Sequence, residues 1–256
     1  MEVITRSKAN VDLLAFLRDR LGIVPDYEEL LEQAYSRLVR KGDTVVDVGA
    51  HQGRHTSVLA DLVGLEGRVL AFEPLPEFAQ LLQQSLPAPP VRVIAAALSD
   101  KPGESSFVRA RGVPSESGLV ARRYNYPELV TPETIQVKVE RLDDHLTELA
   151  GLRFVKIDAE GAEVSILNGG RAVVETFRPF VAVEYGAGSY EAYGLTRASL
   201  FEYAKSMDYV IGDLFGALCE DEHTWLQVCD VSCWDWFLVP RERAEEWLQS
   251  VRTRAV

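Results

Sequence analysis

The segment at residues 44–53 (TVVDVGAHQG) constrains the fold most, because a β-branched run passes directly into a glycine turn. Residues 44–48 read as a buried parallel strand, since Val and Thr suit a sheet that is covered on both faces. Gly49 lets the chain turn tightly, and residues 56–63 (TSVLADLV) then read as a helix. A strand, a tight turn and a helix in this order predict one βα unit of a parallel sheet.

The alternation of short apolar strands and helices continues through most of the chain. Further strands are expected at residues 68–72, 91–98, 154–157, 180–185, 209–214 and 236–239, and further helices at residues 77–86, 164–176 and 197–207. Crossovers of this kind place parallel strands side by side, with helices on both faces of the sheet. We therefore predict an α/β fold, Rossmann-like and doubly wound, with a mostly parallel sheet of about seven strands. Its last two strands are expected to form an antiparallel pair.

Two regions depart from that alternation. Residues 1–40 carry apolar residues at helical spacing, so we expect an N-terminal helical cap on a main domain of residues 41–256. Residues 105–110 and 134–140 alternate in the manner of strands, with a loop rich in Gly, Ser and Pro between them. We expect a β-rich insertion at about residues 101–140, over the sheet edge or the mouth of the site. The apolar faces of the cap are also compatible with a homodimer.

The charge of the chain bears on its partners. A net charge of -12 would repel nucleic acid. The clearest basic cluster consists of Arg109, Arg111, Arg122 and Arg123. We expect this cluster to be a solvated loop face, and a site for an anionic group of a substrate is the alternative. Nucleic acid is therefore not an expected partner.

Membrane and secretion signals are also missing from the sequence. No apolar run approaches the roughly 18 residues of a membrane span, and the charged first residues lack the apolar core of a secretory signal. Three cysteines are too few, and odd in number, for a disulfide framework. We therefore expect no membrane association and a cytoplasmic location.

Four residues of the zinc-ligand type lie close together, namely Cys219, His223, Cys229 and Cys233. Their spacing does not match the C-x₂-C knuckle of structural zinc sites. Free cysteine beside tryptophan is common in a packed core. We therefore predict buried core here and no metal site.

The glycine turn indicates what kind of ligand the first strand meets. A dinucleotide fingerprint has the spacing G-x-G-x-x-G, whereas Gly49 and Gly53 are separated by three residues. Ala50 and His51 lie between them. This turn is a poor cradle for pyrophosphate and suits an amino-acid-like ligand with a carboxylate and an ammonium, which Asp47 is placed to meet. Ordinary turn geometry is the alternative explanation for the glycines.

Glu73 closes the second predicted strand in the sequence AFEP, about 26 residues after Asp47. An acid at this position holds a ribose diol by two hydrogen bonds. Together with the glycine turn, it favours a cofactor that carries adenosine. Nicotinamide-dependent dehydrogenases share the acid, and the glycine spacing argues against them.

The segment KIDAEGAE at residues 156–163 ends the fourth predicted strand of the parallel sheet. Ligands of doubly wound sheets bind at the carboxyl ends of the strands, so Lys156, Asp158 and Glu160 come near the crevice. Asp158 or Glu160 is our candidate for a general base, and Lys156 for an orienting charge. A structural cluster of ion pairs is the alternative. Glu184, at the end of the fifth strand, is similarly placed.

Five short segments together carry a family resemblance. They are VDVGAHQG at residues 46–53, AFEP at 71–74, AALSD at 96–100, VERLDD at 139–144 and VKIDAEGAE at 155–163. In order and combination they resemble the FkbM-type methyltransferase family, over about residues 43–184. A weaker match follows in DLFG at residues 213–216. The family usually has Asn where this chain has His51.

The resemblance implies a class I methyltransferase fold, S-adenosylmethionine as cofactor, and O-methylation of sugars, polyketides or other secondary metabolites. By this analogy the cofactor is held by Asp47, Gly49, Gly53 and Glu73, with adenine near Leu98 and Ser99. Ala50, His51, Pro74 and Asp158 complete the predicted cofactor site.

We therefore predict a methyltransferase that uses S-adenosylmethionine to methylate a hydroxyl or carboxylate oxygen of a small-molecule, sugar or peptide acceptor. A hydroxyl acceptor needs a base, whereas a carboxylate acceptor needs none. One alternative is a nicotinamide-dependent oxidoreductase. The other is a non-catalytic adenosyl-binding module on the same fold.

Overall fold

The computed structural model describes residues 5–86 and 88–251. Its α-helices are α1 (Arg6–Leu21), α2 (Tyr27–Tyr35), α3 (Arg54–Val63), α4 (Pro76–Ser85), α5 (Glu163–Gly169), α6 (Arg171–Phe177), α7 (Ala187–Ala192), α8 (Ser199–Ser206), α9 (Glu222–Val228) and α10 (Ala244–Val251). The strands are β1 (Thr44–Val48), β2 (Arg68–Phe72), β3 (Val91–Ile94), β4 (Ala97–Leu98), β5 (Gly103–Arg111), β6 (Thr131–Glu140), β7 (Leu152–Ile157), β8 (Phe180–Glu184), β9 (Tyr209–Gly212), β10 (Leu218–Cys219) and β11 (Asp235–Pro240). Short 3₁₀ helices cover Pro114–Glu116, Pro127–Leu129, Leu142–Glu148 and Arg241–Arg243.

The main sheet has eight strands in the order β10-β9-β11-β8-β7-β1-β2-β3. The strands from β8 to β3 pair in parallel, whereas β11 pairs antiparallel with both β8 and β9. The Rossmann-like, doubly wound fold and the late antiparallel pair are thus confirmed. The strand count exceeds the prediction of seven, because the two-residue strand β10 pairs antiparallel with β9.

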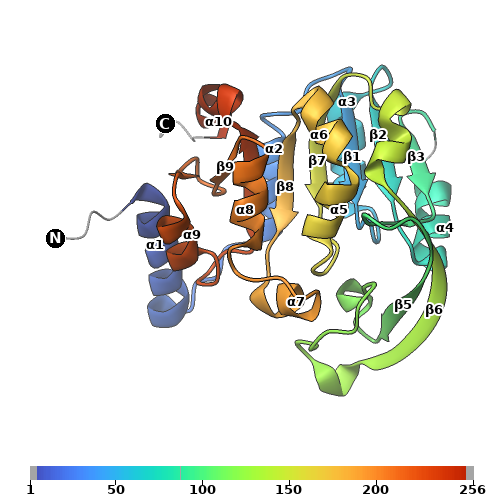
Figure 1. Cartoon of the computed structure of the whole chain (residues 1–256), viewed down its shortest axis with the longest axis horizontal. Helices are drawn as coiled ribbons and strands as arrows, with labels where there is room; N and C mark the ends of the chain where they lie inside the picture. The colour runs from blue at the N-terminus through green and yellow to red at the C-terminus, as the bar shows by residue number, and fades with distance from the viewer. Residues whose placement is uncertain (1–4, 87, 252–256) are drawn as a thin grey trace.

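Strand β1 lies in the interior of the sheet, and all five of its residues are buried. It pairs with β2 on one side and with β7 on the other. Figure 1 shows α5, α6 and α8 in front of the sheet, with α2 behind it. The chain runs outward from β1 to β3 and then returns to β7, so the switch point lies at the carboxyl ends of β1 and β7.

The third predicted strand, residues 91–98, is wrong in its second half. Strand β3 ends at Ile94, and the Ala96 N–H donates to the Ile94 carbonyl (2.9 Å), which bends the chain out of the sheet. Ala97 and Leu98 then form β4, which pairs in parallel with β6. Apolar character alone could not reveal this bend, because both halves of the segment are largely apolar in sequence and pair with different sheets.

Strands β4, β6 and β5 form a second, three-stranded sheet. Strands β5 and β6 are an antiparallel hairpin that pairs residues 103–111 with residues 131–139. The inner face of this sheet packs as a small second core of Leu75, Ala97, Phe107, Val137 and Val139. Figure 1 shows the hairpin beyond the carboxyl ends of the central strands, where it covers the switch point.

Helices α1 and α2 precede the sheet in the chain. Helix α1 packs against α9 and β10 at one edge, and α2 packs against α10. Leu13 and Phe16 of α1 are exposed, and the homodimer expected from such faces stays a prediction. Among the described residues, no helix combines the length and the hydrophobicity needed to cross a membrane.

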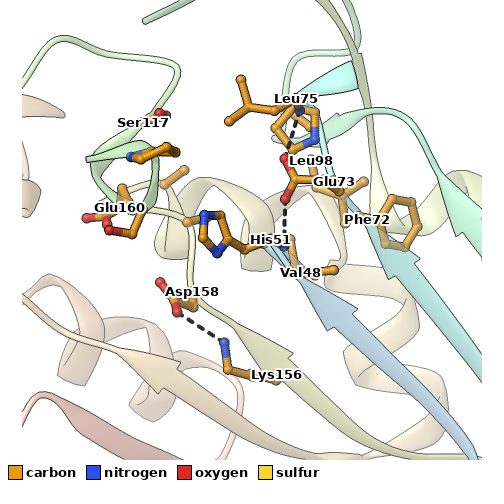
Figure 2. Close-up of a pocket in the computed structure, with 18 of the residues that line it drawn as sticks. Val48, His51, Phe72, Glu73, Leu75, Leu98, Ser117, Lys156, Asp158 and Glu160 are labelled. Carbon is orange, nitrogen blue, oxygen red and sulfur yellow. Dashed lines mark hydrogen bonds and ion pairs between the residues drawn. The ribbon is translucent and has the colours of Figure 1, made fainter. Parts of the chain in front are cut away.

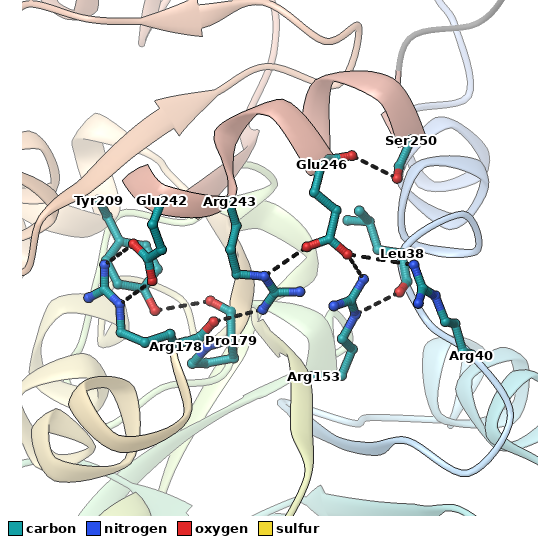
Figure 3. A network of polar contacts seen from close by, with 10 residues as sticks. All are labelled: Leu38, Arg40, Arg153, Arg178, Pro179, Tyr209, Glu242, Arg243, Glu246 and Ser250. Carbon is teal, nitrogen blue, oxygen red and sulfur yellow. Dashed lines mark hydrogen bonds and ion pairs between the residues drawn. The ribbon is translucent and has the colours of Figure 1, made fainter.

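At the amino-terminal ends of the strands, away from the switch point, arginine–carboxylate contacts hold the chain together (Figure 3). Arg178 Nη2 lies 2.8 Å from Glu242 Oε2, and Arg243 Nε lies 2.9 Å from Glu246 Oε2. Arg153, near the start of β7, also binds Glu246. These contacts attach the C-terminal helix α10 to the sheet at the end away from the cavity described below.

Candidate functional site

A cavity of about 400 Å³ lies at the carboxyl ends of β2, β1 and β7, at the switch point of the sheet. The turns after these strands form its floor, and β4, β5 and the loop at residues 114–119 form its roof. Helix α2 and the start of α3 close one side. The volume falls in the range of roughly 300–1,000 Å³ that is usual for small-molecule sites. Figure 2 shows side chains converging on this space from several elements.

The glycine turn after β1 brings backbone to the cavity. Gly49 has φ 79°, and a Cβ at this position would collide with the Asp158 carbonyl oxygen. Only glycine therefore allows the turns after β1 and β7 to approach so closely. His51 also has a positive φ of 48°, and its backbone N–H donates to Glu73 Oε2 (2.7 Å).

The His51 ring is fixed against Phe78, with 4.3 Å between the ring centroids. Burial lowers the pKa of His51, so its imidazole is neutral at neutral pH. Its Nε2 is buried, and within residues 5–86 and 88–251 it has no hydrogen-bond partner. A buried polar atom without a partner is costly, and a ligand that hydrogen-bonds to it would remove that cost.

Glu73 is oriented by backbone amides. Its Oε1 accepts from Leu75 N–H (2.8 Å), and its Oε2 accepts from His51 N–H. Burial raises the pKa of Glu73 to about 7. Each carboxylate oxygen has a second lone pair, so the group can still accept two hydroxyl hydrogens from a ligand.

The cavity wall brings together most of the residues predicted for the site. Those that line it are Gly49, Ala50, His51, Glu73, Pro74, Leu98, Lys156, Asp158 and Glu160. Asp47 lies outside the wall, where its Oδ2 accepts from Thr56 Oγ1 (2.6 Å). Gly53 is the N-cap of α3, and the Ser99 hydroxyl bonds to Asp100 (3.1 Å). These two residues also lie outside the wall.

Three carboxylates gather where β7 and β8 end. Asp158, Glu160 and Glu184 each place an oxygen within 4.8 Å of the other two. Burial and the charge of Asp158 raise the pKa of Glu160 to about 8, and they raise the pKa of Glu184 well above its usual range. Burial alone would also raise the pKa of Asp158, but the Lys156 ammonium and a hydrogen bond from Glu184 together outweigh it and hold that pKa low. Asp158 is thus the ionised member of a group of three at neutral pH.

Arg122 binds this cluster from the insertion. It pairs with Glu160, and its Nη2 lies 3.7 Å from Glu116 Oε2. Glu160 has a positive φ of 57°, so the turn after β7 presents it toward the insertion. The other arginines of the basic cluster do not converge here, since Arg109 and Arg111 bind Glu133. Both residues lie on strand β5 and not on a loop, and Arg109 is largely buried between Glu77 and Glu133, so the predicted solvated loop face does not describe Arg109 or Arg122.

Two further cavity residues, Glu28 and His55, are missed by sequence reasoning. Glu28 belongs to a helix ahead of the first strand, and nothing in its local pattern points toward the sheet. His55 lies beside the glycine turn, which is the one available signal. Its Nε2 lies 2.6 Å from Glu28 Oε2, and its Nδ1 lies 3.1 Å from the Tyr35 hydroxyl.

The three cysteines are buried. Cys229 Sγ lies 3.6 Å from Arg197 Nη2, and Cys233 Sγ lies 3.3 Å from the Asp235 carbonyl oxygen. These contacts are those of core thiols packed beside polar groups. His223 is hydrogen-bonded to Gln227 (3.0 Å).

The doubly wound sheet, the glycine turn after β1 and the acid after β2 define a class of α/β proteins that bind nucleoside cofactors at the switch point. The family model described as methyltransferase FkbM domain matches residues 47–214. The chain therefore belongs to the FkbM methyltransferase family, whose members use S-adenosylmethionine as cofactor.

Curated relatives match a short part of the chain. A protein-L-isoaspartate O-methyltransferase from Ignicoccus hospitalis is 44% identical over 50 residues, which is 20% of this chain and 24% of that protein. A protein-L-isoaspartate O-methyltransferase from Methanococcus aeolicus is 35% identical over 48 residues, which is 19% of this chain and 22% of that protein. The chain thus spans about a quarter of the length of the curated relatives that it matches.

Two solved structures are similar at low identity. The methyltransferase FkbM of Methylobacillus flagellatus is 16% identical with a TM-score of 0.44, covering 91% of this chain and 59% of that one. An rRNA-methylase of Clostridium thermocellum, itself described as putative, is 14% identical with a TM-score of 0.45, covering 84% and 95%. The chain is assigned to the family by the family model that matches residues 47–214.

The residues present fit this cofactor. Glu73 keeps lone pairs for two ribose hydroxyls, and the unpartnered Nε2 of His51 provides a polar contact inside the cavity. Leu98 and Phe107 line it with apolar surface of the kind that adenine packs against.

Proposed function

We propose that this chain catalyses O-methylation, with S-adenosylmethionine as methyl donor and a hydroxyl or carboxylate oxygen of a small-molecule, sugar or peptide acceptor. The observation that carries the proposal is the single ionised carboxylate, Asp158, between two carboxyls with raised pKa values at one end of the cavity. Carboxyl groups whose pKa values are driven apart are typical of acid–base chemistry.

The cofactor residues divide by position. Glu73 binds the ribose, Gly49 and Ala50 let backbone approach the ligand, and Leu98 with Pro74 packs near the adenine. Asp47, Gly53 and Ser99 act from outside the wall. In this arrangement Asp47 holds Thr56, and Gly53 starts α3.

When bound, S-adenosylmethionine supplies an electrophilic methyl group. The chain itself positions the acceptor oxygen and takes its proton. Asp158 is the base because it is ionised and its side chain is 36% exposed at the cavity. Lys156 keeps Asp158 ionised and oriented from 3.1 Å away. Glu160 is protonated at neutral pH and donates a hydrogen bond to the acceptor.

Two comparisons support oxygen as the acceptor atom. The family resemblance implies O-methylation, and the two curated relatives are named as O-methyltransferases. An ionised carboxylate at the cavity also suits a hydroxyl acceptor, whose proton must be removed when its oxygen is methylated.

Methyl transfer is tested with S-adenosylmethionine labelled with tritium in its methyl group and a panel of sugars, hydroxy acids, phenols and short peptides. We expect label in at least one oxygen-bearing acceptor, and mild alkali distinguishes a labile methyl ester from a stable methyl ether. Label that appears only in amines would contradict O-methylation. Cofactor binding with no transfer to any acceptor would favour the non-catalytic adenosyl-binding module.

A further inference from the structure

Glu28 reaches the cavity from helix α2, ahead of the residues 47–214 that the family model matches. Asp26 caps this helix, with its Oδ1 accepting from the Glu29 N–H (3.0 Å). The cap fixes the first turn of α2, and that turn contains Glu28. The carboxylate therefore enters the cavity from a defined position.

A chain of two hydrogen bonds orients Glu28. The Tyr35 hydroxyl lies 3.1 Å from His55 Nδ1, and His55 Nε2 lies 2.6 Å from Glu28 Oε2. Tyr35 is fully buried, which raises its pKa and keeps its hydroxyl protonated. An ionised Glu28 carboxylate can only accept, so His55 Nε2 donates to it, and in the neutral tautomer Nδ1 is left to accept from the Tyr35 hydroxyl.

Glu28 is an ionised group with one oxygen left for a ligand. The His55 hydrogen bond, and after it the electrostatic influence of His55 and of Lys156, hold the pKa of Glu28 below its usual range. Only Oε2 is used by His55, and within the described parts of the chain no hydrogen bond reaches Oε1. The side chain is 49% exposed.

The neighbouring acids already have partners. Asp158 Oδ2 lies 3.1 Å from Lys156 Nζ, and Glu160 is paired with Arg122. Asp47, which the sequence places near an ammonium group, lies outside the cavity wall. Of these acids in the described chain, Glu28 is the one that is ionised, faces the cavity and forms no ion pair with a lysine or an arginine.

The place of Glu28 along the cavity indicates which part of the cofactor it meets. Glu73 follows β2 at one end, whereas Glu28 interacts electrostatically with Lys156 and Asp158, which mark the β7 end. The cavity continues from Glu73 past the turn after β1 to Lys156 and Asp158, so a cofactor with its ribose at Glu73 would have room for its amino-acid end toward β7. We propose that Glu28, positioned by His55 and Tyr35, binds the α-ammonium of the methionyl end of S-adenosylmethionine.

This inference rests on the proposed function, and ligand binding tests it without an acceptor. Two probes are titrated by calorimetry: S-adenosylhomocysteine, which has the amino-acid end, and 5′-methylthioadenosine, which lacks it. Glu28→Gln removes the charge and keeps the shape. We expect S-adenosylhomocysteine to bind about tenfold more weakly or worse, and 5′-methylthioadenosine to bind as it does to the unaltered protein.

Glu29→Gln is the matched control, because Glu29 lies next to Glu28 on the same helix and accepts from Gln33 instead (3.2 Å). It should change neither affinity. His55→Phe removes the group that orients Glu28, so it should weaken S-adenosylhomocysteine selectively. Combined with Glu28→Gln, it should add little further loss.

Equal losses for both probes in Glu28→Gln would mean a structural role for Glu28 and would overturn the inference. Unchanged affinity for S-adenosylhomocysteine would overturn it as well. An unaltered protein that binds neither probe would instead contradict the cofactor assignment itself, which is a distinguishable failure.

Discussion

Lys156 Nζ and Asp158 Oδ2 lie 3.1 Å apart at the end of β7, with the lysine almost fully buried and the aspartate open to the cavity. Lys156 lies in β7 and Asp158 directly follows the strand, and their side chains point toward one another (Figure 2). Burial acts against the charge of Asp158, and the Lys156 ammonium together with a hydrogen bond from Glu184 keeps it ionised. The pair thus provides a fixed carboxylate base beside the cofactor cavity.

Asp158→Asn tests that role. The amide keeps the size of the side chain and removes its basicity, so turnover of a hydroxyl acceptor should fall by about 100-fold or more. Affinity for S-adenosylhomocysteine, measured by calorimetry, should change much less. Asp61→Asn, on the outer surface of α3, is the control and should keep full turnover. Normal turnover in Asp158→Asn would exclude this residue as the base.

Glu73→Ala tests the ribose contact. The substitution removes the acceptor for two backbone N–H groups and for the ribose hydroxyls. Affinity for both S-adenosylhomocysteine and 5′-methylthioadenosine should fall about tenfold or more. Both losses are expected here because both probes carry ribose, in contrast to the selective loss at Glu28. Unchanged affinity would count against the assignment of Glu73, and Glu66→Ala on the surface serves as the comparison.

Buried carboxyls predict that the ligand-free protein loses stability as the pH rises. Burial raises the pKa values of Glu163 and Asp235 to about 7. A pKa raised in the folded state gives stability that is complete below the unfolded pKa and is lost as the pH rises through the folded pKa. The melting temperature should therefore fall between about pH 5 and pH 8.

Glu163→Gln should flatten that dependence, because the amide oxygen can still accept from Ala159 and Gly161 N–H without a charge. Between pH 6 and pH 8 the variant should lose about 1 kcal/mol less of its unfolding free energy than the unaltered protein. Chemical denaturation at the two pH values measures this difference. If both proteins lost the same unfolding free energy between pH 6 and pH 8, that result would contradict a proton held on Glu163 in the folded state.

Gly49→Ala should damage the fold itself. A methyl group at this left-handed position would collide with the Asp158 carbonyl oxygen, so we expect a loss of more than about 2 kcal/mol of stability. Gly188→Ala, in α7, meets no heavy atom within 4 Å and should stay within about 1 kcal/mol of the parent. Thermal melts of both variants check the contrast, and similar melting temperatures would argue against the close approach of β1 and β7.

Residue patterns predict the central strands well because β1, β7 and β8 are almost entirely buried and a glycine turn marks the end of the first of them. The β-branched run at residues 44–48 is typical of a parallel strand buried on both faces, so its place inside the sheet follows from its amino-acid composition and its position before a turn and a helix. After Ile94 the chain leaves the main sheet at a hydrogen bond from the Ala96 N–H to the Ile94 carbonyl. Strand β10 is only two residues long and is defined by its pairing with β9. Local apolar patterns contain no information about either feature.

The site residues also fall into those that the sequence could identify and those that it could not. Glu73 and Asp158 could be found because each directly follows a predicted strand, and strand ends converge in a doubly wound sheet. Glu28 and Arg122 come from a helix and a loop far along the chain from those strands. Their approach depends on how α2 and the insertion pack, which no sequence period specifies. Asp47 is the opposite case: it lies in β1 two residues before Gly49, and its side chain bonds to Thr56 and does not line the cavity.

Calorimetric titration of the unaltered protein with S-adenosylhomocysteine and, separately, with NAD tests the central claim most directly. The account predicts binding of S-adenosylhomocysteine at one site per chain and no binding of NAD. Binding of NAD alone, or of neither ligand, would contradict the assignment of the cavity at β2, β1 and β7 to S-adenosylmethionine.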